Sequence, residues 1–99
     1  MARLIIWSPR ATEDIEAVAA YIAQDSEAYA TSVIRNILLK TRILTDFPLM
    51  GRIVPEFDDE SIREIFAYSY RIIYRVDKEQ VTIAAVIHGK RLLELAIEP

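Results

Sequence analysis

The chain has 99 residues, of which 53% are hydrophobic, with a net charge of −3 and no cysteine. This length predicts a single domain over residues 1–99, and the lack of cysteine excludes disulfides and thiolate metal sites. One histidine cannot build a zinc site without several carboxylates, so we expect no metal and no cofactor. No stretch reaches the ~18 apolar residues of a membrane span and no signal peptide opens the chain, so we expect a soluble cytoplasmic protein.

The acidic balance also bears on the kind of partner. General nucleic-acid binders are normally basic, because neutralising phosphates supplies most of their affinity. The sequence pI is about 5.1, so we expect no direct, sequence-specific binding of nucleic acid, while a local basic patch stays open. The high apolar fraction fits either a surface for a bound partner or a compact helix-rich core.

The first half of the chain predicts a short strand followed by two helices. Residues 3–7 form an apolar run that is typical of a buried strand. Ser8 is a good N-cap for a helix over residues 9–24. Asp25-Ser26 breaks the helical pattern and supplies a second cap, and the second helix is expected over residues 27–46. The link between them is only two or three residues long, so the helices should pair antiparallel.

The second half predicts a three-stranded meander after an irregular stretch. Residues 48–61 contain Pro, Gly and an acidic run, which indicates a surface connection. Strands are expected over residues 62–67, 70–76 and 81–88. The order β-α-α-β-β-β predicts an α+β fold, with an antiparallel sheet covered on one face by an antiparallel helix hairpin.

The middle strand of this meander alternates in character, so its two faces should differ. One face should pack on the helices and the other should expose two arginines around an isoleucine. The first face carries Tyr70, Ile72, Tyr74 and Val76, and the second carries Arg71, Ile73, Arg75 and Asp77.

No enzyme motif stands out, and the residues with chemical potential are few. His88 is a candidate general acid or base, because its unperturbed pKa lies near neutrality. The guanidinium groups of Arg71 and Arg75 could hold phosphate or the carboxylates of a protein partner. They could equally pair inside the fold, and the acids available for that pairing are Glu64, Asp77 and Glu79.

Five short motifs occur in order along nearly the whole chain: WSPRA, FPLMGR, IREI, YRIIYRV and VIHGKR. Together they resemble the ParE/RelE superfamily of toxins from bacterial type II toxin–antitoxin systems, and are closest to the ParE or plasmid stabilisation branch. The resemblance implies a small β-α-α-β-β-β toxin and a cognate ParD-like antitoxin whose C-terminal segment wraps it. ParE-type toxins poison DNA gyrase, whereas RelE-type members cleave mRNA in the ribosome.

The resemblance also separates two mechanisms. In a RelE-type ribonuclease the catalytic residues would be Arg63, Arg71, His88 and Arg91, but no tyrosine follows Arg91 and Glu64 is acidic. We therefore favour a non-catalytic toxin with DNA gyrase as its target, with a ribosome-dependent mRNA endoribonuclease as the alternative. An inactive relative that only binds its antitoxin is a third possibility.

Two groups of residues are expected to bind protein partners in a hetero-oligomer with the antitoxin. Basic side chains would meet acidic partner residues, and one apolar helix face would form a groove for an amphipathic helix. The basic group is Arg52, Arg71, Arg75, His88 and Arg91, and the apolar group is Ile15, Ala19 and Ile22, which could instead belong to the core.

Overall fold

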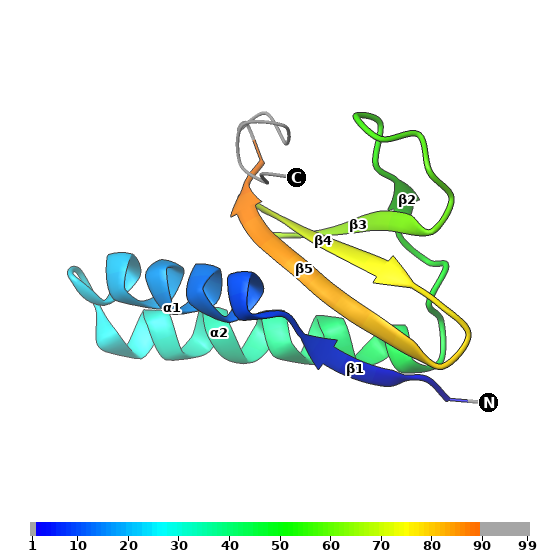
Figure 1. Ribbon diagram of the computed structural model, residues 1–99. Coiled ribbons are helices and arrows are strands. Elements are labelled where there is room, and N and C mark those ends of the chain that lie inside the picture. Colours follow the sequence, from blue (N-terminus) through cyan, green and yellow to red (C-terminus); the bar gives the residue numbers. More distant parts are fainter. Residues whose placement is uncertain (1, 90–99) are drawn as a thin grey trace.

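The computed structural model describes residues 2–89 and shows two helices packed on one face of a sheet (Figure 1). The elements follow in the order β1 (Leu4–Trp7), α1 (Pro9–Ala23), α2 (Glu27–Arg42), a 3-10 turn η1 (Ile43–Thr45), β2 (Arg52–Ile53), β3 (Ile62–Ala67), β4 (Tyr70–Val76) and β5 (Gln80–His88). The α+β class and the helix-covered sheet predicted from the sequence are therefore confirmed. Within the described residues, no helix is long and apolar enough to cross a membrane.

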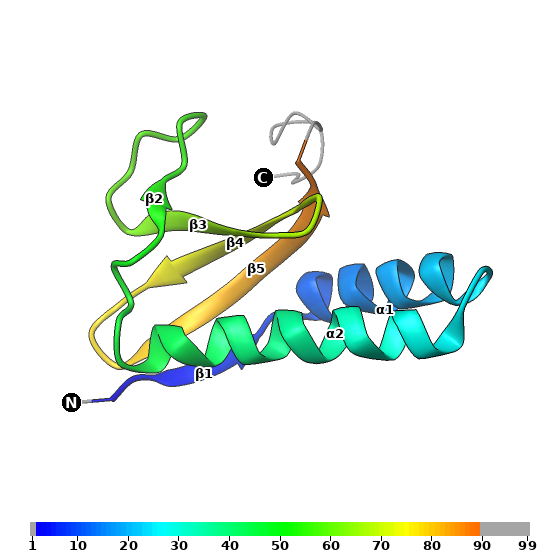
Figure 2. The same cartoon turned by 180° about the vertical axis from the view of Figure 1, so that it is seen from behind.

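Serine caps start both helices, as the sequence predicts. The Ser8 hydroxyl accepts a hydrogen bond from the Ala11 amide at 3.0 Å, and the Ser26 hydroxyl accepts one from the Tyr29 amide at 3.0 Å. The α-helical part of the second helix ends at Arg42, and a 3-10 turn carries the chain on to Thr45. The two helices run antiparallel and side by side, with α2 below the strands and α1 extending beyond the end of β5 (Figure 1 and Figure 2).

The sheet differs from the expected meander in two respects. Its strand order is β1-β5-β4-β3-β2, and β1 pairs with β5 in parallel, so the sheet is mixed rather than antiparallel. Strand β2 lies inside the stretch predicted to be irregular, where Arg52 pairs with Glu64. Parallel strands cannot be joined by a tight turn. Here the helical hairpin and strands β2 to β4 lie between β1 and β5 in the sequence, and the chain returns so that β5 lies beside β1.

Beyond the end of β1, side chains from the start of α1 bind the free edge of β5. Strand β1 pairs with β5 only as far as Ile83, and Ala84 is then bulged, since Ile73 faces Ala85 while Tyr74 faces Ile83. The Ser8 hydroxyl donates to the Ala84 carbonyl at 3.1 Å, and the Val86 amide donates to Asp14 at 2.9 Å. Side chains of the helix start therefore satisfy backbone groups that a neighbouring strand would otherwise pair.

The face of the sheet toward the helices carries the main core. Ile72 and Tyr74 of β4 are buried there with Val33, Ile37 and Leu44, which confirms the predicted inward face. The opposite face was expected to be exposed around Ile73, and this expectation is wrong. Ile73 is buried in a second cluster on that face, whose other buried members are Val54, Ala85 and Ile87.

Tyr74 joins the core to the loop that precedes β2. Its hydroxyl donates to the Pro48 carbonyl at 2.8 Å and accepts from the Gly51 amide at 3.0 Å. Burial raises the pKa of the Tyr74 phenol above its ordinary value. Gly51 lies so close to these atoms that an added Cβ would be 2.5 Å from the Glu64 carbonyl oxygen and 2.6 Å from the Tyr74 hydroxyl.

We expect Gly51→Ala to lower the free energy of unfolding by about 2–3 kcal/mol, because backbone rather than a flexible side chain must move to admit the methyl group. Urea denaturation of the full chain measures this loss. Gly89→Ala is the matched control, since its Cβ would come no nearer than 3.2 Å to the Ser69 carbonyl oxygen. Equal stability losses in the two variants would contradict the packing argument.

Candidate functional site

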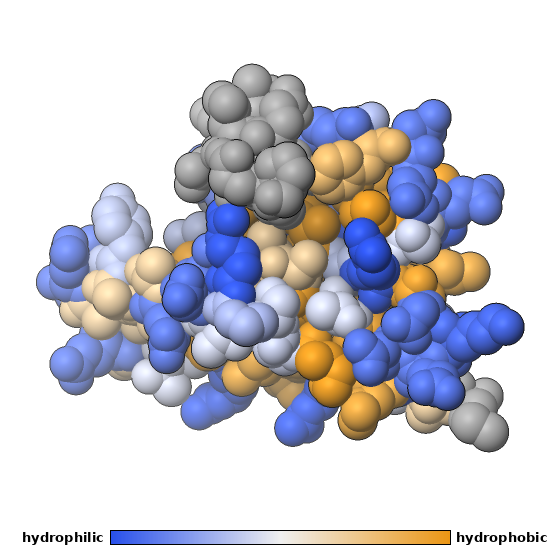
Figure 3. Space-filling model, in the orientation of Figure 1, coloured by the Kyte–Doolittle hydropathy of each residue, from blue (hydrophilic) through white to orange (hydrophobic). Residues whose placement is uncertain are grey.

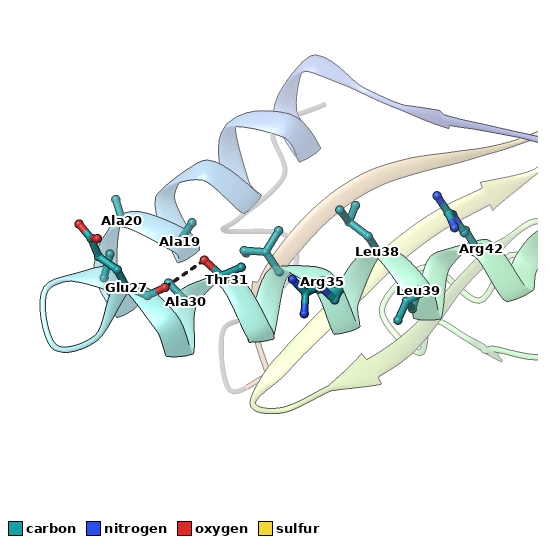
Figure 4. Close-up of a pocket in the computed structure, with 11 residues that line it drawn as sticks. Ala19, Ala20, Glu27, Ala30, Thr31, Arg35, Leu38, Leu39 and Arg42 are labelled. Atoms are coloured by element: carbon teal, nitrogen blue, oxygen red, sulfur yellow. Dashed lines mark hydrogen bonds between the residues drawn. The ribbon is translucent and has the colours of Figure 1, made fainter.

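A groove of about 810 Å³ runs along the outer side of the helical hairpin (Figure 4). Small side chains of α1 form one part of it and longer side chains of α2 form the rest. The α1 residues are Ala19, Ala20 and Ala23, and the α2 residues are Glu27, Ala30, Thr31, Ile34, Arg35, Leu38, Leu39 and Arg42. The groove is thus largely apolar along its length.

The groove also has a charge polarity that follows from the order of residues on α2. Glu27 lies at the end near the helix–helix turn, while Arg35 and Arg42 lie toward the other end (Figure 4). Leu38 and Leu39 remain exposed beside the arginines. Apolar side chains with opposite charges toward the two ends are what an amphipathic helix with complementary charges would bind.

The three apolar residues predicted to form one docking face lie in different environments in the structure. Ala19 lines the groove. Ile15 and Ile22 are partly buried against the main core, in line with the alternative that they belong to it. Ile22 also borders a smaller hollow of about 560 Å³, where Tyr21, Tyr68 and His88 meet.

Arg71 lies on the sheet face away from the helices and is enclosed by carboxylates. Its Nε donates to Glu64 at 2.6 Å, and its two Nη atoms donate to the two oxygens of Glu56 at 2.8 and 2.9 Å. The Arg71 side chain is 7% exposed and that of Glu64 is 0% exposed. Arg52 also donates to Glu64, at 2.5 Å, and stands over the Phe66 ring at 5.1 Å.

This enclosure corrects the expectation that Arg71 is exposed on the outer face of the sheet. The hydrogen bonds from Glu56, followed by those from Glu64, raise the pKa of Arg71 above its ordinary value and outweigh the opposing effect of burial. Pairing with Glu64 was one of the alternatives that the sequence left open, and the structure confirms it. Arg75, four residues after Arg71 on the same face of β4, is exposed as expected.

The described members of the hypothetical ribonuclease set do not converge on one place. Arg63 lies on the opposite face of β3 from Glu64, where it donates to the Glu60 and Gly51 carbonyls at 3.0 Å each. His88 packs edge-on against Tyr70, with ring centroids 6.1 Å apart, at the hollow beside the helices. Arg71 is on the other face, and Arg91 lies outside the described residues.

Comparison with protein families decides the family of the chain. Residues 5–93 match the family model described as the ParE toxin of the type II toxin–antitoxin system parDE. The chain belongs to this family. A search of curated proteins gave no significant match.

Two solved structures share the fold of this ParE-family toxin. A chromosomal ParDE toxin–antitoxin system from P. aeruginosa superposes with a TM-score of 0.73 at 15% identity, covering 90% of this chain and 98% of that chain. A YoeB dimer from Staphylococcus aureus superposes with a TM-score of 0.62 at 17% identity, covering 89% of this chain and 98% of that chain. At such identities the likeness shows the architecture.

The pairing of Glu56 with Arg71 was not predicted, because the sequence places Glu56 in an acidic run of the surface connection. Nothing local distinguishes Glu56 from Asp58, Asp59 or Glu60, because its role depends on the loop folding back over β4. Among residues 2–89, no cluster of acidic and histidine side chains could hold a metal ion. Every buried side-chain polar atom in that range has a hydrogen-bond partner.

Arg71→Ala should lower the free energy of unfolding by about 3 kcal/mol. The substitution leaves the buried Glu64 with Arg52 as its remaining ion-pair partner and removes the two hydrogen bonds between Arg71 and Glu56. Arg75→Ala removes the same charge from an exposed position of the same strand face and should cost about 0.5 kcal/mol or less. Equilibrium urea denaturation of both variants checks the difference. Similar losses would show that the carboxylate enclosure contributes little.

Proposed function

We propose that this ParE-family toxin inhibits DNA gyrase by direct protein contact and is silenced by a cognate ParD-like antitoxin. The observation that carries the antitoxin part is the open groove along α2, in which the side chains of Leu38 and Leu39 stay exposed. An antitoxin segment would bind there as an amphipathic helix and complete a cytoplasmic hetero-oligomer. Gyrase as the target is what membership in the family suggests.

The apolar surface of the molecule supports a role in protein binding. Large apolar side chains are exposed on both helices and on β1, for example Tyr21, Leu39 and Leu4. Figure 3 shows apolar surface between charged side chains over the strands of one face. A small domain with this much exposed apolar surface gains free energy by covering it with a partner.

A non-catalytic mechanism fits the placement of the basic residues. Arg63, Arg71 and His88 are the described candidates for cleaving RNA, and they lie on different faces of the sheet. Arg71 is also engaged by two carboxylates, which compete with any substrate phosphate. The ribonuclease alternative therefore has no specific observation in its favour within residues 2–89.

A supercoiling assay with purified gyrase tests the target. The full-length toxin should block supercoiling or accumulate cleaved DNA at about micromolar concentration, which corresponds to about 8 kcal/mol of binding free energy. Adding the antitoxin should restore supercoiling. Normal supercoiling together with cleaved mRNA in growth-arrested cells would reject gyrase in favour of the ribonuclease.

Leu38→Glu tests the groove, since it places a charge among the apolar side chains that an antitoxin helix would cover. We expect the affinity for the antitoxin to fall by roughly 10- to 100-fold, in line with the loss of about 1.4–2.8 kcal/mol at a binding hot spot. Leu49→Glu is the matched control, because Leu49 is also an exposed leucine but lies outside the groove. Isothermal titration calorimetry gives both affinities, and equal values would move the antitoxin to another surface.

A further inference from the structure

The two carboxylates that hold Arg71 differ in burial and in the kind of segment that carries them. Glu64 belongs to β3, has a side chain with 0% exposure, and is also held by Arg52. Glu56 belongs to the connection over residues 54–61, and its side chain is 21% exposed. Glu64 therefore orients the guanidinium from its Nε side, while the Nη edge is closed by a carboxylate within reach of solvent.

We propose that the Nη edge of Arg71 is a binding site for a carboxylate of an acidic peptide segment, and that Glu56 is an internal plug which this segment displaces. The paired bonds to Glu56, at 2.8 and 2.9 Å, are the fork geometry by which arginine recognises any carboxylate. Displacement exchanges one such pair of bonds for another, so the guanidinium stays satisfied. The site is thus prepared in advance and occupied by the chain itself.

The surroundings of Arg71 define what the peptide should carry beside its carboxylate. Phe66 lies directly opposite Arg71 on the neighbouring strand, and its ring is exposed. Arg52 stands over this ring and is itself 58% exposed. An acidic residue followed by an apolar one would therefore meet the Arg71 fork, the Phe66 ring and a second guanidinium together.

Charge favours a peptide over a nucleic acid at this site. The connection that carries Glu56 also carries Asp58, Asp59 and Glu60, all exposed. Nucleic acids bind through the sum of many phosphate contacts, and these acids repel the further phosphates that such binding requires. A single peptide carboxylate needs only one fork, so its binding suffers much less from this repulsion.

Displacement of Glu56 has a structural consequence for the connection over residues 54–61. The Glu56–Arg71 pair joins this connection to β4 by side chains, whereas the neighbouring pairing of β2 with β3 covers only two residues on each strand. Binding of an acidic peptide should therefore loosen residues 54–61. This site lies on a different face from the groove, so binding there does not depend on gyrase or on helix docking.

The test compares Glu56→Ala with Glu60→Ala in the full-length chain, since both remove one acid from the same connection. The probe is a short peptide with blocked termini that contains one glutamate followed by leucine and no other charged residue, and its binding is measured by thermal unfolding of the protein. At tenfold excess over its dissociation constant, the peptide should raise the unfolding midpoint of Glu56→Ala by roughly 5 °C. Wild type and Glu60→Ala should shift by less than about 1 °C, because the tethered Glu56 competes at high effective concentration.

Two further measurements keep the inference open to refutation if Glu56→Ala folds poorly. Glu56→Gln keeps the shape of the plug without its charge and should also respond to the peptide. In the wild type, hydrogen exchange at residues 54–61 should quicken when the peptide is in large excess. No midpoint shift in either Glu56 variant, or exchange that does not change, would overturn the proposal.

Controls separate the carboxylate fork from general charge attraction. Adding Arg71→Lys to Glu56→Ala should abolish the response, because lysine cannot form the paired bonds. A larger midpoint shift with a single-stranded RNA decamer than with the peptide would reject the peptide as the ligand class. Inorganic phosphate should act more weakly than the peptide, because it lacks the apolar contact with Phe66.

Discussion

A guanidinium that is withdrawn from water needs carboxylates around it, and this need shapes the sheet face away from the helices. Arg71 is almost fully buried there, and Glu64 and Glu56 supply its partners. Without them the buried charge would cost several kcal/mol, roughly the stability margin of a small domain. The network draws the connection over residues 54–61 against β4 and closes the Nη edge of Arg71 with Glu56. A residue that resembles a catalytic or contact arginine by motif thus has a structural role.

On the opposite side of the molecule, the dominant feature is apolar side chains that stay exposed to solvent instead of packing in the core. The sheet takes Val33 and Ile37 of α2 into the interior, but Leu38 and Leu39 remain exposed in the part of the chain that the structure describes. The alanines of α1 keep the neighbouring helix surface low, which leaves a groove rather than a ridge. A toxin that must be silenced benefits from such a surface, because binding covers apolar area that folding leaves exposed.

Much of the fold was readable from local signals. Ser8 and Ser26 marked both helix starts, and the alternation of β4 correctly placed Ile72 and Tyr74 toward the helices. The parallel pairing of β1 could not be predicted, because the alternation of residues along a strand is the same in a parallel and an antiparallel pair. The candidate site was readable only in part: Ala19 does line the groove, yet the leucines of α2 beside it were not singled out. Their exposure depends on the angle at which the hairpin meets the sheet.

The sequence by itself determined the family, the helical hairpin and the strands other than β2, because motifs, caps and periodicity are short-range properties of the chain. Only the tertiary structure decided what the basic residues do. It placed Arg63 and Arg71 on opposite faces of β3 and β4, set His88 beside Tyr70, and joined Arg71 to Glu56 across fifteen residues. These outcomes depend on strand register and on the path of a loop. Both are set by packing between distant segments, so no local pattern of residues encodes them.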